Sequence, residues 1–111
     1  MKKTIMLFAG TTAGRRICEF LAVKKCITHV YVTTEYGKEL LPGQNNVHIH
    51  VGKMDEKQMS HEIKAIHPDI VIDATHPHAT QVTHNIKELC DSGNIFYVRV
   101  LREESIEKAG N

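Results

Sequence analysis

The sequence predicts an α/β protein: a Rossmann-like, mostly parallel five-stranded sheet with helices on both faces. Short apolar runs rich in strand-forming residues alternate with segments in which apolar residues recur at helical spacing. In addition, the first apolar run, residues 5–9, leads into a glycine-bearing turn and then a helix, an order typical of phosphate-binding α/β proteins. Such alternation implies parallel strands joined by right-handed crossovers, which places helices on both faces of the sheet.

The elements follow from local patterns in chain order. Ile17 and Leu21 share the apolar face of the first helix, and Asp55 is expected to cap a helix that Pro68 stops. The unbroken apolar centre of residues 69–73 indicates a strand buried on both faces. Strands are predicted at residues 4–9, 29–33, 47–51, 69–73 and 95–100, and helices at residues 14–23, 38–41, 55–66 and 79–91.

Length and composition indicate a single nucleotide-binding Rossmann-like domain at residues 1–100 of the 111. Residues 101–111 are read as a charged tail or as the start of a missing second domain. A complete doubly wound nucleotide domain often carries a sixth strand, and a substrate usually needs a second wall. The sequence does not indicate an oligomeric state.

The net charge of +1 gives no electrostatic reason to expect nucleic acid or an anionic membrane as a partner. The apolar run after Lys2 and Lys3 is too short for a secretion signal or a membrane span, so the expected location is the cytoplasm. The three cysteines lack metal-ligand or redox spacing, and Cys18 and Cys90 are expected to be reduced and buried on helix faces.

Three segments are predicted at the carboxyl edge of the sheet, where open parallel sheets bind ligands: residues 10–15, 33–37 and 73–79. In the first, Thr11 and Thr12 offer donors to a pyrophosphate and Arg15 a charge-assisted contact. The alternative is that the threonines only cap the helix. Ala9 and Ala13 break the G-x-G-x-x-G pattern, so the fingerprint alone is a weak match.

The end of the second strand faces the adenosine ribose in such folds, and an NAD-selective site places Asp or Glu there. Thr33 and Thr34 stand at this point, with Glu35 one step further. The pattern leans towards NADPH, but a contact from Glu35 to a ribose hydroxyl leaves NADH open.

In the third segment, the small residues Ala74 and Thr75 allow a ring to approach closely, and Pro77 suits a turn or a first helical position. His76 is the one candidate for proton transfer, although hydrogen bonding to a ligand or ordering of the loop is the favoured role. No other catalytic residue is indicated.

Eight histidines raise the question of a metal site. His48 and His50 share one face of a predicted strand, and His76, His78 and His84 lie close in sequence. No cysteine at ligand spacing and no trio of carboxylates accompanies them. The prediction is therefore that the protein holds no specific metal, with the first two rings at a sheet edge or in solvent.

Three stretches together resemble the precorrin-6A reductase family of cobalamin biosynthesis, in its aerobic and its cobalt-containing forms. They are residues 8–15 (FAGTTAGR), 34–37 (TEYG) and 73–79 (DATHPHA), and the connecting residues 51–55 and 97–100 are also similar. The sequence departs from the family at Ala9, Ala13 and His78, where Gly, Glu and Phe are usual. Family members are also longer, so the resemblance implies that a second domain is missing.

The resemblance implies an enzyme that uses NADPH or NADH to reduce one double bond of a small-molecule tetrapyrrole by hydride transfer, in a cleft between two α/β domains. Arg15, Lys38 and Arg99 are candidates to position its carboxylates. A non-catalytic nucleotide-binding or sensing module is the alternative. By resemblance, the cofactor-binding residues are Gly10, Thr11, Thr12, Gly14, Arg15, Thr34, Thr75, His76 and Pro77, and the substrate-binding residues are Tyr36 and Gly37.

Overall fold

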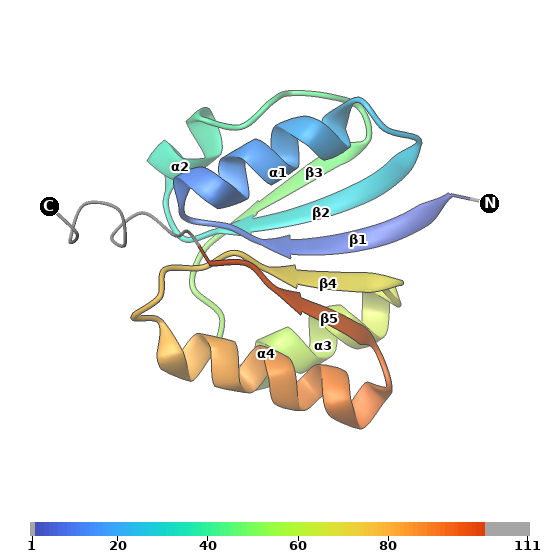
Figure 1. The fold of residues 1–111 in the computed structure, drawn as a ribbon, viewed down its shortest axis with the longest axis vertical. Helices are drawn as coiled ribbons and strands as arrows, with labels where there is room; N and C mark the ends of the chain where they lie inside the picture. Colours follow the sequence, from blue (N-terminus) through green and yellow to red (C-terminus); the bar gives the residue numbers. More distant parts are fainter. Residues whose placement is uncertain (1, 102–111) are drawn as a thin grey trace, which may run out of the picture.

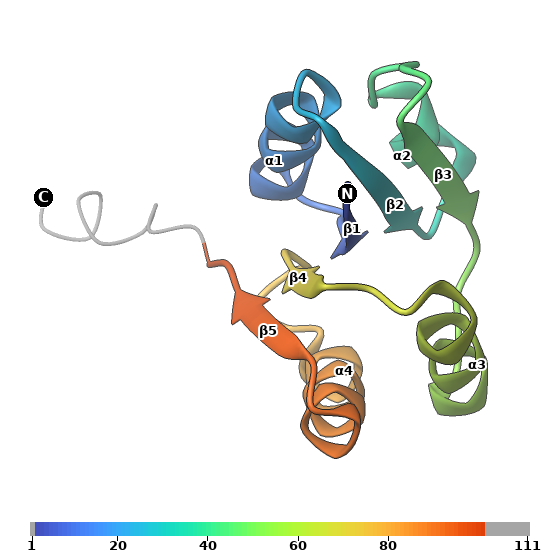
Figure 2. The same ribbon diagram turned by 90° about the vertical axis from the view of Figure 1, so that its right-hand side faces the viewer.

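The protein, described for residues 2–101 by a computed structural model, folds as a five-stranded parallel sheet between two pairs of helices. Figures 1 and 2 show α1 and α2 on one face of the sheet and α3 and α4 on the other. The predicted fold class is therefore confirmed. In chain order the elements are β1 (Lys3–Phe8), α1 (Thr12–Ala22), β2 (Cys26–Val32), α2 (Glu35–Glu39), β3 (Val47–Val51), α3 (Glu56–Ile66), β4 (Ile70–Asp73), α4 (Thr80–Gly93) and β5 (Phe96–Arg99).

The strand order β3-β2-β1-β4-β5 reverses direction between β1 and β4. The chain builds outward from β1 through β2 to β3, then crosses to β4 on the other side of β1. Phe8 of β1 lies beside Asp73 of β4, so these two strands end level with each other. A crevice forms at this kind of switch point because the loops that follow the two strands leave in opposite directions.

The sheet separates two apolar layers. On one face, Met6 and Val71 pack with Ile63 of α3 and Ile86 of α4. On the other face, the side chains that alternate with these, such as Leu7, pack against Cys18 and Ala22 of α1. Burial on both faces explains why β1 reads as a continuous apolar run rather than an alternating one.

Several boundaries differ from the sequence prediction. α1 begins at Thr12 and not at residue 14, because the Thr11 hydroxyl accepts the Gly14 amide and caps the helix two residues earlier. β2 begins at Cys26 and not at residue 29, since its first residues pair with the start of β1. α2 occupies Glu35–Glu39 and not residues 38–41, because Thr34 caps it in the same way as Thr11 caps α1.

The other helix ends agree closely with the sequence signals. Asp55 caps α3 in a reciprocal arrangement with Gln58, and His67 adopts a left-handed conformation directly before Pro68. α4 continues to Gly93, two residues past the prediction, and ends at left-handed Asn94.

The cysteine prediction is confirmed for both helix thiols. Cys18 and Cys90 are fully buried, and burial raises the pKa of each thiol to about 11. No helix within residues 2–101 is long and apolar enough to cross a membrane. The tail predicted at residues 101–111 lies, except for Leu101, outside the described residues.

Candidate nucleotide-binding cleft

A cleft of about 860 Å³ opens at the carboxyl edge of the sheet. The three predicted loops meet there, which agrees with the sequence analysis. Its volume lies within the range usual for small-molecule sites. The cleft is lined by Ala9, Gly10, Thr11, Thr12, Arg15, Val32, Thr33, Thr34, Tyr36, Gly37, Leu40, Leu41, His76, Pro77, His78 and Leu101.

The first loop presents backbone and hydroxyl groups to the cleft. Gly10 has φ +140°, and no atom outside Gly10 and its two chain neighbours lies within 4 Å of the position that a Cβ would take. A side chain here would be strained and would extend into open space. Helix geometry leaves the amides of Thr12 and Ala13 without an intrahelical partner, and both stand at the positive end of the α1 dipole.

Gly14 does not line the cleft, although the sequence analysis placed it among the cofactor-binding residues. Its amide is donated to the Thr11 hydroxyl at 3.1 Å. A Cβ on Gly14 would lie 2.8 Å from the Cβ of Ala9 and 3.5 Å from that of Ala74. Gly14 therefore allows α1 to pack closely on the ends of β1 and β4, which is the role of the third glycine in dinucleotide-binding turns.

The second loop contributes hydroxyl and apolar groups. Thr34 lines the cleft while its side chain accepts the Gly37 amide at 3.0 Å. Leu40 and Leu41 also line it, and the sequence analysis missed both because it placed them in a predicted helix at residues 38–41 and took the loop to end at residue 37. Among the described residues that line the cleft, none carries a carboxylate: Glu35 is exposed outside it.

The third loop turns His76, Pro77 and His78 to the cleft. The His78 amide donates to Nδ1 of His76 at 3.1 Å, and the two rings lie 5.0 Å apart. Thr75, also predicted to bind the cofactor, does not line the cleft. Its hydroxyl instead donates to Oδ1 of Asp73 at 2.7 Å.

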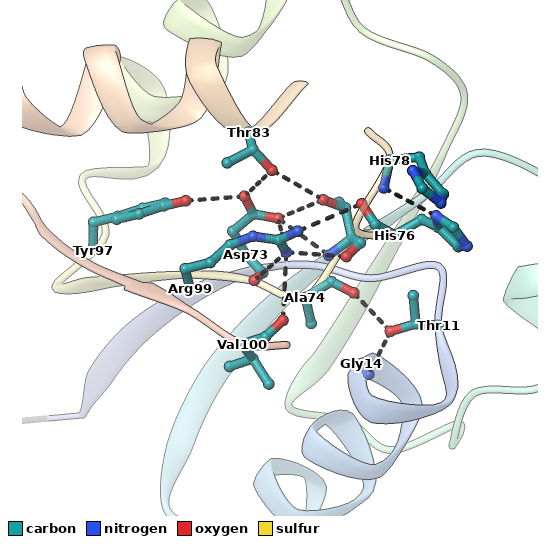
Figure 3. A network of polar contacts seen from close by, with 11 residues as sticks. Thr11, Gly14, Asp73, Ala74, His76, His78, Thr83, Tyr97, Arg99 and Val100 are labelled. Atoms are coloured by element: carbon teal, nitrogen blue, oxygen red, sulfur yellow. Dashed lines mark hydrogen bonds and ion pairs between the residues drawn. The ribbon is translucent and has the colours of Figure 1, made fainter. Parts of the chain in front are cut away.

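Asp73 is the fully buried centre of a polar network behind the third loop (Figure 3). Its Oδ2 accepts from the hydroxyls of Thr83 at 2.7 Å and Tyr97 at 3.0 Å. Burial, together with the charge of Asp73 and this hydrogen bond, raises the pKa of Tyr97 above its usual value. Asp73 thus joins β4 to α4 and to β5.

Arg99 completes the network and does not point its charge into the cleft. Its Nη1 lies 3.3 Å from Oδ1 of Asp73 and donates to the carbonyls of Asp73 and Thr75 at 3.1 and 3.0 Å. The sequence analysis assigned Arg99 to the substrate and missed this role. The signal was the spacing of Tyr97 and Arg99, which puts both on one face of the last strand.

Of the other two cations predicted to position the substrate, Arg15 lines the cleft and Lys38 does not. Nε of Arg15 is 4.0 Å from Glu19, a partly exposed pair one helical turn apart. Such a pair holds an arginine only weakly, so the guanidinium remains available to an anion.

Three histidines lie close together on the sheet face that carries α3 and α4, away from the cleft. Nδ1 of His29 and Nε2 of His50 are 3.1 Å apart, and the ring of His48 stacks on that of His29 at 5.0 Å. His48 and His50 lie on the edge strand β3, as predicted. Within residues 2–101, no three His, Cys, Asp or Glu side chains are arranged to hold a metal ion.

The chain was compared with known protein families, proteins and structures. The family described as precorrin-6x reductase CbiJ/CobK matches residues 4–111. The cobalt-precorrin-6A reductase of Methanothermobacter thermautotrophicus is 31% identical over 106 residues, which make up 95% of this chain and 35% of that protein. The enzyme of the same name from Synechocystis sp. is 29% identical over 99 residues, covering 89% and 38%.

Two solved structures share the fold. CobK precorrin-6A reductase superposes with a TM-score of 0.74 at 21% identity, over 92% of this chain and 39% of that one. The Bordetella bronchiseptica enzyme WbmH, solved in complex with NAD+, gives 0.69 at 18% identity, over 86% and 37%. This chain therefore spans less than two fifths of the length of these relatives. By the match over nearly its whole length, the chain belongs to the precorrin-6x reductase family.

Proposed function

We propose that the chain is the cofactor-binding half of a reductase that acts on precorrin-6A or cobalt-precorrin-6A in cobalamin biosynthesis. The observation that carries the proposal is the three-loop cleft at the β1/β4 switch point, in a chain of this reductase family. The bound NADPH or NADH would supply a hydride to one carbon–carbon double bond of the macrocycle. We also propose a cytoplasmic location, because the proposed role is biosynthetic.

The first loop fits the phosphates of such a cofactor. Gly10 leaves open the space that a Cβ would fill, so a phosphate can approach the backbone. The amides at the start of α1, the hydroxyls of Thr11 and Thr12 and the guanidinium of Arg15 are all suited to an anion.

The second loop favours NADPH over NADH. A ribose 2′-phosphate is repelled by a carboxylate, and the described lining residues include none. Thr33 and Thr34 stand where an NAD-selective site carries an acid. Tyr36 and Gly37, on the rim of the same loop, are proposed to border the substrate, since the exposed ring of Tyr36 offers a flat apolar surface to a macrocycle.

Titration of the purified chain with NADPH and NADH tests the cofactor proposal. We expect NADPH to bind more tightly, and Arg15→Met to weaken its binding about tenfold, the effect of losing one charge-assisted hydrogen bond. Arg16→Met is the matched control, because Arg16 is exposed on α1 and does not line the cleft. An equal loss of NADPH affinity in both variants would show that Arg15 contributes only through its general positive charge and not through a direct contact. No binding of NADPH or NADH by the wild type would refute the proposal.

Turnover is tested by following oxidation of the reduced nicotinamide with the tetrapyrrole. The assay compares this chain alone with the chain joined to the remaining domain of a relative. We expect activity only from the two-domain protein, because the chain forms one wall of the cleft. Nucleotide binding without turnover in either form would instead favour a non-catalytic nucleotide-sensing module.

A further inference from the structure

Four consecutive carbonyls of the third loop are held by protein donors. The Asp73 carbonyl accepts the Val100 amide at 2.9 Å, and the Ala74 carbonyl accepts the Thr11 hydroxyl at 2.7 Å. The next two, on Thr75 and His76, accept from Arg99, and the His76 carbonyl also accepts the amide of Ala79 at 2.9 Å. A loop with this many bonded carbonyls has little freedom to turn its peptide planes.

Arg99 donates to three of these four carbonyls, those of Asp73, Thr75 and His76, through one guanidinium. Besides Asp73 and Thr75, its Nη1 lies 3.4 Å from the Val100 carbonyl, and Nη2 lies 3.4 Å from the His76 carbonyl. Its charge is balanced by the fully buried carboxylate of Asp73. Only arginine offers five donors in a planar, permanently charged group. We call this pair, with the carbonyls it holds, the Asp73–Arg99 clamp.

The held loop fixes the chemistry of one imidazole at the cleft. A backbone amide can only donate, so Nδ1 of His76 must accept in its contact with the amide of His78. In a neutral ring the proton then resides on Nε2. Because His76 lines the cleft, its remaining nitrogen is a hydrogen-bond donor available to a ligand.

We propose that Arg99 is a positioning residue that acts through His76: the Asp73–Arg99 clamp holds the loop in the conformation that keeps His76 in its Nε2-protonated tautomer beside the cleft. The group that His76 meets there rests on the proposed function, and is an acceptor atom such as a phosphate or carboxamide oxygen of the cofactor. The tautomer itself is a property of the free protein, so it can be tested without any ligand.

The test is nitrogen NMR of the ¹⁵N-labelled chain without ligand, at about pH 8, where an ordinary imidazole is neutral. Two-bond nitrogen–proton correlations report the tautomer, and His76→Gln assigns the signals. We expect a single Nε2–H pattern at His76 in the wild type. In Arg99→Met the pattern is expected to average between tautomers, and the amides of Thr75 and His78 to exchange about tenfold faster, because the loop opens locally.

Two further variants keep the test sharp. Arg99→Lys retains the charge but has a single donor group, so an intermediate tautomer pattern is expected. Arg16→Met removes an exposed arginine that touches no part of the clamp, and is expected to leave His76 unchanged. A wild-type tautomer in Arg99→Met would overturn the proposal. Global unfolding of both Arg99 variants would do so as well, since Arg99 would then support the fold and not the loop.

Binding measurements separate this inference from the proposed function. If the wild type binds NADPH, Arg99→Met is expected to weaken binding about tenfold in protein that is still folded, as circular dichroism checks, although its melting temperature falls because the buried Asp73 carboxylate loses its counter-charge. If the wild type does not bind NADPH but the His76 tautomer changes in the Arg99 variants as expected, the role of the Asp73–Arg99 clamp is supported and the cofactor proposal is refuted. If the wild type binds and Arg99→Met binds equally well, His76 is not presented to the cofactor and the inference fails.

Discussion

At the scale of single residues, small side chains and one hydroxyl decide how closely the elements at the cleft approach one another. Oγ1 of Thr11 accepts the Gly14 amide and donates to the Ala74 carbonyl, so one hydroxyl both caps α1 and ties the first loop to the third. Gly14 lets that helix rest against Ala9. The two contacts fix the spacing between loops that line the same cleft.

We expect Gly14→Ala to lower the free energy of unfolding by about 1–3 kcal/mol, although alanine is the better helix former. The reason is that the new methyl group would lie 2.8 Å from the Cβ and 3.0 Å from the Cα of Ala9, and backbone must move to admit it. Urea unfolding measures the effect.

Gly93→Ala is the matched control for this prediction. A Cβ there would meet only the side chain of Ile95, with Cδ1 at 3.2 Å and Cγ1 at 3.5 Å, and this side chain can turn away. The substitution is expected to be neutral or stabilising at the end of α4. Equal destabilisation by both alanines would contradict the packing role of Gly14.

At the scale of elements, the sequence patterns predicted every helix and strand within residues 2–101, and the largest errors lie at the starts of β2, α1 and α2. β2 begins at Cys26 because β1 offers it backbone partners from Lys3 to Phe8. The sequence of a strand does not show where its neighbouring strand begins. The starts of α1 and α2 were missed for a local reason: each is set by a threonine whose hydroxyl accepts an amide three residues later.

The site shows the same division between local and distant signals. The loops that form the cleft were predictable, because the carboxyl ends of parallel strands meet at one edge. The Asp73–Arg99 clamp was not, since its partners are 26 positions apart and Asp73 reads in sequence as the last residue of a strand. Thr75 was misplaced for that reason: its hydroxyl satisfies a buried carboxylate that only the fold reveals.

The pairing of β2 with β3 predicts a pH dependence of stability. Burial, and then the nearby His50 and His48, lower the pKa of His29 below 6.5, against an opposing effect of Glu62. The unfolded chain therefore takes up this proton at a higher pH than the folded protein does. The stabilisation is complete above about pH 6.5 and declines as the pH falls from there to the folded value.

We expect His29→Gln to flatten the decline in unfolding free energy between about pH 7 and pH 5, measured by urea unfolding at each pH. The slope is compared and not the absolute stability, because glutamine also alters the packing at the sheet edge. His84→Gln, on the exposed face of α4, is the control and is expected to keep the wild-type slope. An unchanged slope in His29→Gln would contradict a lowered pKa of His29 in the folded protein.

At the scale of the whole molecule, the sheet separates two apolar layers that each hold a buried thiol. Cys18 lies in the layer under α1, and Cys90 in the layer under α4. Both thiols are fully buried, and burial raises the pKa of each to about 11, so neither reacts without an opening of the structure.

The rate at which each thiol is alkylated in mild urea therefore measures the opening of its own layer. We expect equal opening free energies at Cys18 and Cys90, because the strands are shared by both layers and a domain of this size unfolds as one unit. Mass spectrometry of the alkylated peptides gives the two rates. Clearly faster reaction at Cys90 would show that α4 and β5 detach before the rest of the sheet.

Because Arg99 lies on the last strand, the cleft can form only late in the synthesis of the chain. The ribosome delivers the first two cleft loops early, with the β1–β3 half of the sheet. The third loop has its sequence by residue 79, but the guanidinium that holds it emerges twenty residues later. A nascent chain therefore carries an incomplete cleft until β5 has joined the edge of the sheet and Arg99 has bound the third loop.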